Sequence, residues 1–362
     1  MKIGFIGLGL IGGSIARAVR HFYPDTEIVA FSRTRSSVEQ AVSDGVVDRI
    51  LEGIDGEFSD CSYTFLCAPV SSNAEYLRLL KPFVRPGCII TDVGSTKSDI
   101  HARVEELGME EFFIGGHPMA GSEKTGYANS KRILIENAYY VITPTGRTPE
   151  GAVERYRDFV ASLKALPLVL DCRTHDYVTA GISHLPHIIA SSLVNLVRNE
   201  DTQDGIMRLV AAGGFKDITR IASSSPEMWE QICMTNRGNI SAILSDYIDS
   251  LIAIRGNLDR AEAGAIHSLF ETSRDYRNSL PVKGSGPLER IFEIYCEMVD
   301  EAGGIATLAT ILASNQINLK NVGIVQSREF IEAVLRIEFY DEESKTKAAD
   351  ILRKHRYVIY ER

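Results

Sequence analysis

The sequence lacks the features that mark several classes of protein. Its six cysteines include no C-x-x-C pair, so buried free thiols are the simplest interpretation. No apolar run approaches the roughly 20 residues that a membrane-spanning helix needs. Lysine and arginine (39) are outnumbered by aspartate and glutamate (48), and the net charge of −9 disfavours phosphate backbones. We therefore expect neither a nucleic-acid partner nor a membrane partner.

Size and composition indicate a folded protein of several domains. Hydrophobic residues make up 44% of the chain and charged residues 24%, close to globular averages. A chain of 362 residues is too long for one ordinary core, so two or three domains are expected. The first residues enter a strand pattern at once, without the hydrophobic segment of a signal peptide. A cytoplasmic location is expected.

Residues 1–171 alternate short apolar runs with helical patterns. The expected strands are Lys2–Ile6, Glu27–Phe31, Tyr63–Ala68, Cys88–Asp92, Phe112–Gly115, Tyr139–Ile142 and Pro167–Asp171. The clearest helical patterns are Ile11–Phe22, Ser36–Asp44, Asn73–Leu80 and Pro149–Lys164. Strands that are apolar on both faces and alternate with helices predict a largely parallel sheet covered by helices. This is an α/β, Rossmann-like domain.

The pattern changes twice after residue 171. Strand patterns vanish from Thr174 to about Arg277, and segments such as Leu185–Arg198 and Ile232–Arg255 are helical and apolar nearly all round. We expect an all-α dimerisation domain over 172–280 that intertwines with a second copy as an obligate homodimer. A stretch rich in Pro, Gly and Ser at 278–287 reads as a linker, and residues 288–362 follow a βαββαβ order, an α+β ferredoxin-like arrangement.

A glycine-rich turn follows the first expected strand. Gly7, Gly9 and Gly12 form G-x-G-x-x-G between an apolar strand and an apolar-faced helix, which is the context that a dinucleotide site requires. The first glycine permits the tight turn, the second lets the backbone approach the pyrophosphate, and the third allows close packing of helix and strand. The helix N-terminus adds unpaired N–H groups and partial positive charge.

The second strand ends in Ser32, Arg33, Thr34 and Arg35, where NAD enzymes often carry an acidic residue. A hydroxyl and a guanidinium can accept a 2′-phosphate, so NADP is slightly favoured. Alternatively, the arginines belong to a solvated loop and the cofactor is NAD. The residues predicted to contact the dinucleotide are Gly7, Gly9, Leu10, Ile11, Gly12, Ser32, Arg33, Thr34, Cys67, Ala68 and Pro69.

Polar clusters lie at the ends of three later apolar elements, where the ligand crevice of a sheet is expected. They are Asp92–Lys97, the Gly-rich run Gly115–Gly126, and Ser183–His187 at the start of an apolar helix. A fourth run, Gly213–Ala222, places Arg220 between apolar neighbours. A buried arginine needs an anion, which is either a protein carboxylate or a ligand.

The order and spacing of these motifs resemble the prephenate dehydrogenase family over almost the whole chain. The resemblance runs from the glycine turn through G-G-H-P-M-A-G-S-E, S-H-L-P-H and F-K-D-x-T-R-I-A to a downstream Met-Trp. It implies an oxidative decarboxylation: prephenate loses hydride from C4 to a nicotinamide and its ring carboxylate as CO₂, giving 4-hydroxyphenylpyruvate for tyrosine synthesis. Aromatisation supplies much of the driving force, so no metal is expected.

The resemblance also implies roles for individual residues. His117 would hydrogen-bond and polarise the C4 hydroxyl, a role that suits an imidazole, and Ser95 would orient it. Arg220 would bind a substrate carboxylate, and His187 the pyruvyl side chain. The other residues assigned to the substrate site are Ser183 and His184, which would shape it, Glu123, which would gate it, and Trp229, which would pack near Arg220. Alternatively, Trp229 is a residue of the core. The histidines outside these motifs, His175 among them, are expected to be surface or core residues.

The tail beyond Gly286 is similar to an ACT domain, a small-molecule regulatory module. By that resemblance L-tyrosine, the pathway end product, would bind and inhibit, although the domain could instead only support dimerisation. The predicted regulatory residues are Ala302, Gly303, Gly304, Ile305 and Asn318.

Three other functions compete with this interpretation. Arogenate dehydrogenase uses the same fold and chemistry on an amino acid in place of a keto acid. A non-catalytic amino-acid sensor would keep the cofactor fold without turnover, although Ser95, His117 and Arg220 argue against it. A 3-hydroxyacid dehydrogenase is disfavoured because Ser183–His187 replaces the lysine that such enzymes carry on the corresponding helix.

Overall fold

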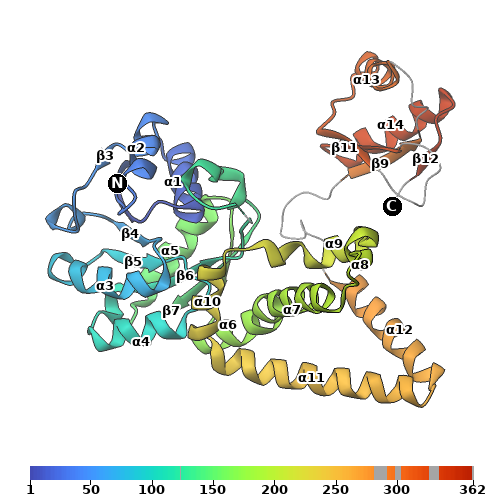
Figure 1. Ribbon diagram of the computed structural model, residues 1–362. Coiled ribbons are helices and arrows are strands. Elements are labelled where there is room, and N and C mark those ends of the chain that lie inside the picture. The colour runs from blue at the N-terminus through green and yellow to red at the C-terminus, as the bar shows by residue number, and fades with distance from the viewer. Residues whose placement is uncertain (123, 281–291, 298–302, 326–333, 361–362) are drawn as a thin grey trace. The chain divides into compact units, whose positions relative to one another are not determined.

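The structure is a computed structural model that describes residues 1–122, 124–280, 292–297, 303–325 and 334–360. The chain divides into two compact units, Met1–Leu269 and Phe270–Arg362 (Figure 1). The first unit contains the cofactor turn and every predicted catalytic cluster. Most of the predicted linker lies outside the described residues, as do Glu123 and Ala302.

A five-stranded parallel sheet lies at the centre of the first unit, in the order β3-β2-β1-β4-β5 (Figure 1). Its strands are β1 (Lys2–Ile6), β2 (Glu27–Phe31), β3 (Arg49–Ile50), β4 (Tyr63–Leu66) and β5 (Ile89–Asp92). Every residue of β1, β4 and β5 is buried, as expected for strands covered on both faces. The predicted parallel sheet is confirmed. Because β1 and β4 are neighbours, the strand order reverses between them, and a ligand crevice is expected at their carboxyl ends.

A second sheet of three strands continues this layer. Its strands are β6 (Ile114–Pro118), β7 (Tyr139–Pro144) and β8 (Leu166–Val169). β6 pairs with β7 in antiparallel fashion, and β7 pairs with β8 in parallel. A parallel bridge between Ile90 and Phe113 brings the start of β6 alongside β5. Consequently β5 and β6 end at the same edge, and β6 continues beyond the predicted Gly115 to include His117.

Helices cover both faces of the five-stranded sheet. One core contains residues of α1 (Leu10–Phe22), α2 (Arg35–Ser43) and α5 (Glu150–Ser162). The other contains residues of α3 (Val70–Leu80) and α4 (Ser98–Glu106). The sequence predicted four of these five helices to within a few residues. The exception is α4, whose nine residues, Ser98 to Glu106, include only two buried apolar side chains, Ile100 and Val104.

The rest of the first unit is helical, as predicted. Its helices are α6 (Cys172–Thr179), α7 (Leu185–Glu200), α8 (Ile206–Val210), α9 (Gly213–Thr219), α10 (Pro226–Thr235), α11 (Arg237–Asp259) and α12 (Ala263–Ser279), the last running into the second unit. The single helix predicted over Ile232–Arg255 is wrong, because Asn236 (φ −115°, ψ 23°) separates α10 from α11. The apolar pattern continues through the break, so periodicity alone could not reveal it.

The continuous helical segment Cys172–Glu200 corrects another expectation. It spans 29 residues, and its most apolar window has a mean hydropathy of 1.3, with 22% of that window buried. By length and composition such a helix could cross a membrane, so the statement that no apolar run approaches this length does not hold. A π-helical turn over Ala180–His184 joins α6 to α7. Pro186 accounts for it, because proline has no N–H for the carbonyl four residues earlier.

The second unit contains β9 (Phe292–Glu297), α13 (Gly304–Ser314), β10 (Asn321–Val325), β11 (Val334–Phe339), α14 (Glu342–Lys354) and β12 (Ile359–Tyr360). Its sheet has the order β10-β11-β9-β12, and all three pairings are antiparallel. Ile294, Ile337, Leu308 and Leu352 join sheet and helices in one core. The predicted ferredoxin-like arrangement, which ACT domains share, is confirmed.

Candidate active site

The glycine turn after β1 packs against the loop that follows β4. Gly7 has φ +85°, and a Cβ there would lie 2.8 Å from the Ala68 nitrogen. A Cβ on Gly12 would lie 2.8 Å from the Cβ of Cys67. A Cβ on Gly9, in contrast, would meet no protein atom within 4 Å. Packing within the protein therefore requires Gly7 and Gly12, whereas Gly9 keeps a space open beside the turn.

The N-terminus of α1 borders that space. Gly9 is its N-cap, no side chain caps the helix, and the first turn has no acidic residue. Leu10 and Ile11 begin the helix, so their N–H groups belong to the set that lacks intrahelical partners. Uncapped N–H groups and the positive end of the helix dipole favour an anion. These residues fit the pyrophosphate of a dinucleotide, which would approach at Gly9.

The end of β2 is less basic than its sequence suggests. Arg35 pairs with Glu39 at 3.0 Å and with Glu52 at 2.7 Å, and these contacts offset its charge. Arg33 extends across to α3 and donates to the Ser72 hydroxyl at 3.2 Å. The Ser32 hydroxyl accepts from the Thr34 backbone N–H at 3.3 Å. Of the two arginines, Arg33 is therefore the one placed to meet the adenosine end of a cofactor.

His117 lies near the end of β6 and is only 8% exposed. Its Nδ1 lies 2.8 Å from Nε2 of His175 on α6. His175 was expected to be a surface or core residue; it is buried, as a core residue is, but it also contacts the predicted catalytic imidazole. Sequence reasoning missed this contact because 58 residues separate the pair.

A buried ion pair lies beneath His117. Lys97 is fully buried, and its ammonium group bonds to Asp92 at the end of β5 and, at 2.9 Å, to the Gly116 carbonyl. Burial lowers the pKa of His117 well below its usual 6.5, and the nearby His175, Lys97 and His184 lower it further. His117 is thus a neutral imidazole at pH 7 and can accept a proton. The half-buried Ser95 lies in the loop between Asp92 and Lys97.

The π-helical turn presents the next cluster. His187 stacks on Trp229 of α10, with ring centroids 3.8 Å apart, and Trp229 also meets the edge of His184. Burial lowers the pKa of His184 to about 4 and also lowers that of His187, so both are neutral at pH 7. Ser183 is half-buried, and its carbonyl contacts Nδ1 of His187 at 2.9 Å.

Two polar nitrogens in this cluster have no partner among the described residues. They are Nε2 of His184 and Nε1 of Trp229, both buried. Asn236 donates to Nδ1 of His184 at 3.1 Å, so the proton of this neutral ring is on Nε2. The indole Nε1 also carries a proton. The cluster therefore offers two unused N–H donors to a ligand, as the oxygens of a carboxylate or keto group require.

Arg220 differs from its prediction. It follows α9 and is exposed, so the argument that a buried arginine requires an anion does not apply. Trp229 contacts His187 and His184. The assignment of Arg220 to a substrate carboxylate therefore depends on the motif alone. Lys124, next to Glu123, is exposed.

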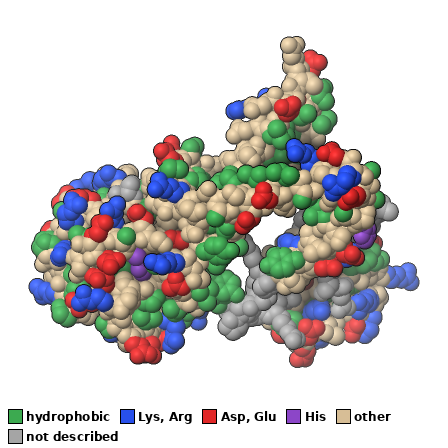
Figure 2. Space-filling view, turned by 90° about the horizontal axis from the view of Figure 1, so that it is seen from below, with side chains coloured by type: hydrophobic (Ala, Val, Ile, Leu, Met, Phe, Trp, Pro, Cys, Tyr) green, Lys and Arg blue, Asp and Glu red, His purple; other side chains and the backbone are tan. Residues whose placement is uncertain are grey.

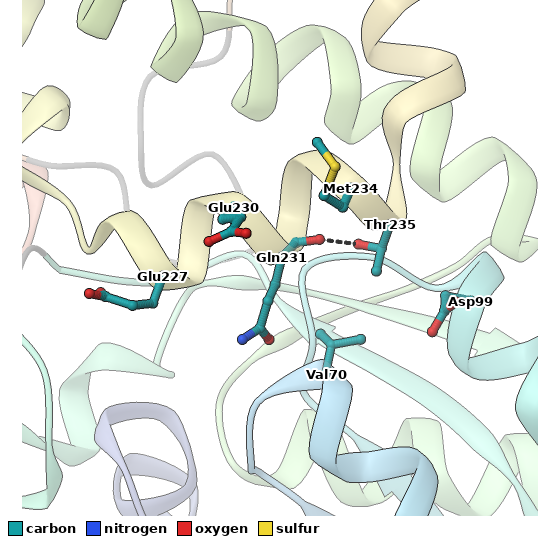
Figure 3. Close-up of a pocket in the computed structure, with 7 residues that line it drawn as sticks. All are labelled: Val70, Asp99, Glu227, Glu230, Gln231, Met234 and Thr235. Atoms are coloured by element: carbon teal, nitrogen blue, oxygen red, sulfur yellow. Dashed lines mark hydrogen bonds between the residues drawn. The ribbon is translucent and has the colours of Figure 1, made fainter.

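A cavity of about 550 Å³ lies between α10 and the first turns of α3 and α4 (Figure 3). Its lining residues are Val70, Asp99, Glu227, Glu230, Gln231, Met234 and Thr235. It adjoins the predicted cofactor loop, since Val70 directly follows Pro69. Asp99, Glu227 and Glu230 come from separate positions around it and would repel a dianion, so the cavity does not suit prephenate.

The predicted regulatory residues lie in the second unit, where β9 leads to α13. Gly303 is the N-cap of α13 with φ +94°, which favours glycine, and Gly304 begins the helix. Ile305 in its first turn is 45% exposed, and Asn318 is also exposed. An exposed apolar residue beside a helix N-terminus is compatible with a small amphipathic ligand.

Two family models match the chain. The model described as prephenate dehydrogenase, nucleotide-binding domain, matches residues 15–168, and the one described as prephenate dehydrogenase, dimerization domain, matches residues 171–272. The prephenate dehydrogenase of Bacillus subtilis (strain 168) is 34% identical over 344 residues, which cover 94% of this chain and 93% of the relative. Both halves of the first unit are thus similar to parts of one kind of enzyme.

Two solved structures are similar over the same region. Prephenate dehydrogenase from A. aeolicus, in complex with hydroxyphenyl propionate and NAD+, is 28% identical with a TM-score of 0.72 and covers 77% of this chain and 98% of its own. Arogenate dehydrogenase from Synechocystis is 30% identical with a TM-score of 0.69 and covers 77% of this chain and 99% of its own. Relatives of this architecture thus include enzymes named for each of the two substrates.

Proposed function

The chain belongs to the prephenate dehydrogenase family, and from that premise we propose how its own residues carry out the oxidative decarboxylation of prephenate. The observation that carries the proposal is the pairing of a neutral, buried His117 with two unused N–H donors, on His184 and Trp229. A proton acceptor and donors for anionic oxygens are what a hydroxylated dicarboxylate needs.

In this proposal His117 accepts the C4 hydroxyl proton while the C4–H bond breaks, and Ser95 holds the same oxygen. A nicotinamide bound at the glycine turn would supply the acceptor for the hydride from C4. The ring carboxylate then leaves as CO₂, its bonding electrons complete the aromatic ring, and His117 returns the proton to the phenolate oxygen. No external base is therefore needed, because His117 takes up one proton and returns it within the same turnover.

The side-chain end of the site favours prephenate over arogenate. His184 Nε2–H and Trp229 Nε1–H suit the keto and carboxylate oxygens of a pyruvyl group, and neither can accept a hydrogen bond from an ammonium group. Initial rates with prephenate and arogenate, each with NAD and NADP, test this. Faster turnover of arogenate would overturn the substrate assignment.

A sensor without turnover remains the alternative of another class. His117→Asn should abolish NAD reduction while cofactor binding, followed by NADH fluorescence, persists. If the native protein binds a nucleotide and reduces none in the presence of prephenate, the sensor interpretation replaces the enzyme.

NAD is the proposed cofactor. Glu39 and Glu52 already neutralise Arg35, which removes half of the argument for a 2′-phosphate site, and NAD+ is bound in the A. aeolicus relative. Because Glu52 pairs with the Arg35 guanidinium at 2.7 Å, Glu52→Gln should free this charge for a 2′-phosphate and raise kcat/KM for NADP relative to NAD. A native preference for NADP would refute this assignment.

A homodimer is the proposed assembly. The residues that match the dimerization domain carry many exposed apolar side chains, among them Leu196, Leu209, Val210, Leu251, Ile252 and Leu258. Figure 2 shows hydrophobic side chains lying among charged ones over the face of the molecule that it draws. A second copy would cover them, and would also cover the apolar helix Cys172–Glu200 without any membrane.

L-tyrosine is the proposed effector of the ACT-like unit. The unit has a ferredoxin-like sheet, and Gly303, in the left-handed region, is the N-cap of α13, whose first turn contains the exposed Ile305. Deleting residues 288–362 should remove inhibition by tyrosine and leave the catalytic rate measurable. Unchanged inhibition after the deletion would contradict the proposal.

A further inference from the structure

A chain of hydrogen bonds runs from His117 into the protein interior. Nδ1 of His117 lies 2.8 Å from Nε2 of His175, and Nδ1 of His175 lies 2.8 Å from Oδ1 of Asp176. All three side chains are buried, with exposed fractions of 8%, 1% and 1%. These hydrogen bonds connect the end of β6 with α6, and the bonds of Asp176 connect α6 with the start of α4.

Asp176 is held as an acceptor at the inner end. Its Oδ1 accepts the backbone N–H of Lys97 at 2.7 Å, and its Oδ2 accepts that of Ser98 at 2.8 Å. Although burial raises the pKa of Asp176, bonds from His175, Ser98 and Lys97 lower it on balance below its usual 3.8. The carboxylate therefore has no proton to give, and His175 must donate to it through Nδ1.

The remaining protons follow from this one. If His175 carries a single ring proton, on Nδ1, its Nε2 is an acceptor. Nδ1 of His117 must then donate to that Nε2. The lone pair of His117 is consequently on Nε2, the ring nitrogen that takes no part in the hydrogen bond to His175.

We infer that His175 and Asp176 are positioning residues that fix the tautomer of His117, so that Nε2 faces the substrate as a proton acceptor. The inference rests on the proposed function, because it assigns the direction of proton transfer within that reaction.

The same series of hydrogen bonds also stabilises the positive charge that forms on His117 during turnover. When Nε2 of His117 takes the hydroxyl proton, an O–H bond breaks, an N–H bond forms, and the ring becomes a buried cation. His175 accepts from its Nδ1–H and can take that proton while giving its own Nδ1 proton toward Asp176. When the phenolate takes the proton back, each shift reverses, so no proton is gained or lost.

The surroundings of His117 make this support necessary. The ammonium group of Lys97 and the rings of His175 and His184 all disfavour a positive charge on His117. Asp92 is occupied by Lys97, the Gly94 N–H and the Gly116 N–H. Asp176 is the carboxylate that two hydrogen bonds, through His175, connect to the protonated ring of His117.

The test compares kcat in three variants. The order of the kcat losses that we expect is the reverse of the order that structural damage alone would give. In Asp176→Asn the amide oxygen can still accept the N–H groups of Lys97 and His175, but the amide carries no negative charge to stabilise the proton that the His117–His175 pair takes up during turnover. We expect kcat to fall about 10²–10⁴-fold, the range of general acid–base catalysis. In His175→Gln the amide oxygen can still accept from His117, so kcat should fall only about tenfold. His175→Leu offers no acceptor and should lose about 10²-fold or more.

KM for prephenate and the dissociation constant of NADH should change little in all three variants. The ¹⁵N shifts of the His117 ring should report a proton on Nδ1 in the wild type. The matched control is His101→Gln, which removes a half-buried imidazole near Lys97 whose Nε2 lies 2.9 Å from the Thr143 hydroxyl. This control should leave kcat within about twofold of the wild type.

A purely structural role predicts another order, with the near-isosteric Asp176→Asn mildest and both His175 variants worse. That order, or ¹⁵N shifts that place the proton of wild-type His117 on Nε2, would overturn the inference. If Asp176→Asn does not fold, the comparison of kcat in His175→Gln and His175→Leu, together with the ¹⁵N shifts of the wild type, still tests the inference. Failure of the wild type to oxidise prephenate would refute the proposed function instead, so the two failures are distinguishable.

Discussion

Gly9 and Gly12 are three positions apart, yet their missing side chains have opposite surroundings. A Cβ on Gly12 would lie 2.8 Å from Cys67, whereas one on Gly9 would meet no protein atom. Gly12→Ala should therefore destabilise the fold by about 1–3 kcal/mol through overpacking. Gly9→Ala should leave the melting temperature unchanged and weaken NADH binding about tenfold to hundredfold, because the methyl group enters the space of the pyrophosphate.

Thermal unfolding and fluorescence titration of NADH separate the two effects. Each variant is the control for the other, since both replace a glycine of the same turn by alanine. A loss of stability in Gly9→Ala, or unchanged NADH affinity in that variant, would show that the open space does not receive the cofactor.

Buried neutral histidines make the first unit sensitive to acid. Burial lowers the pKa of His184 to about 4, and burial followed by the charge of Lys97 lowers that of His101 to about 4. In the unfolded chain both titrate near 6.5. Between pH 6.5 and about 4 the unfolded state thus binds more protons, and stability falls as the pH falls.

The expected slope is at most about 1.4 kcal/mol per pH unit for each histidine. Urea unfolding at pH 7, 5.5 and 4.5 measures it, and His101→Gln should reduce the slope by the share of that ring. A stability that stays constant down to pH 4.5 would show that these rings are protonated in the folded protein.

At the scale of elements, Asn236 joins three helices where α10 ends and α11 begins. Its amide donates to the Asp176 carbonyl at 2.7 Å and to Nδ1 of His184 at 3.1 Å. Asn236→Ala would leave Nδ1 of His184 buried without a donor and would remove one of several hydrogen bonds to the Asp176 carbonyl, so the free energy of unfolding should fall by about 1–3 kcal/mol. Asn239→Ala, which loses a bond to Asn236 in a more exposed position, is the control and should cost less. Equal losses in the two variants would contradict this account.

At the scale of the whole molecule, the exposed apolar face of α11 should hold two copies together. Leu251 and Ile252 are 45% and 51% exposed within one chain. Leu251→Glu should therefore shift the protein towards a monomer in sedimentation velocity, because burying the new charge in an apolar interface is costly. Leu79→Glu on α3, at 44% exposure outside this face, is the control and should leave the assembly unchanged. A native monomer at all concentrations would refute the dimer.

The regular elements were predictable because their signals are local. The alternation of buried strands and amphipathic helices predicted seven of the strands in the first unit, and it missed β3, which has only two residues. The sequence also predicted the helical character of 172–280 but not the break at Asn236. That break depends on side-chain bonds to α6 and to the π-helical turn rather than on a change of pattern.

By itself the sequence determined the glycine turn, the layered sheet and the motif that contains His117, because each depends on neighbours a few positions away. Only the tertiary structure decided the partners of the site. In the folded protein His175 contacts His117, and Asp176 accepts the first N–H groups at the start of α4. Trp229 stacks on His187, and Arg220 is exposed. These contacts join residues 42 to 79 positions apart, and they form only when α6 and α10 pack against the end of the sheet. Such pairings carry no periodicity, so a single sequence does not encode them in readable form.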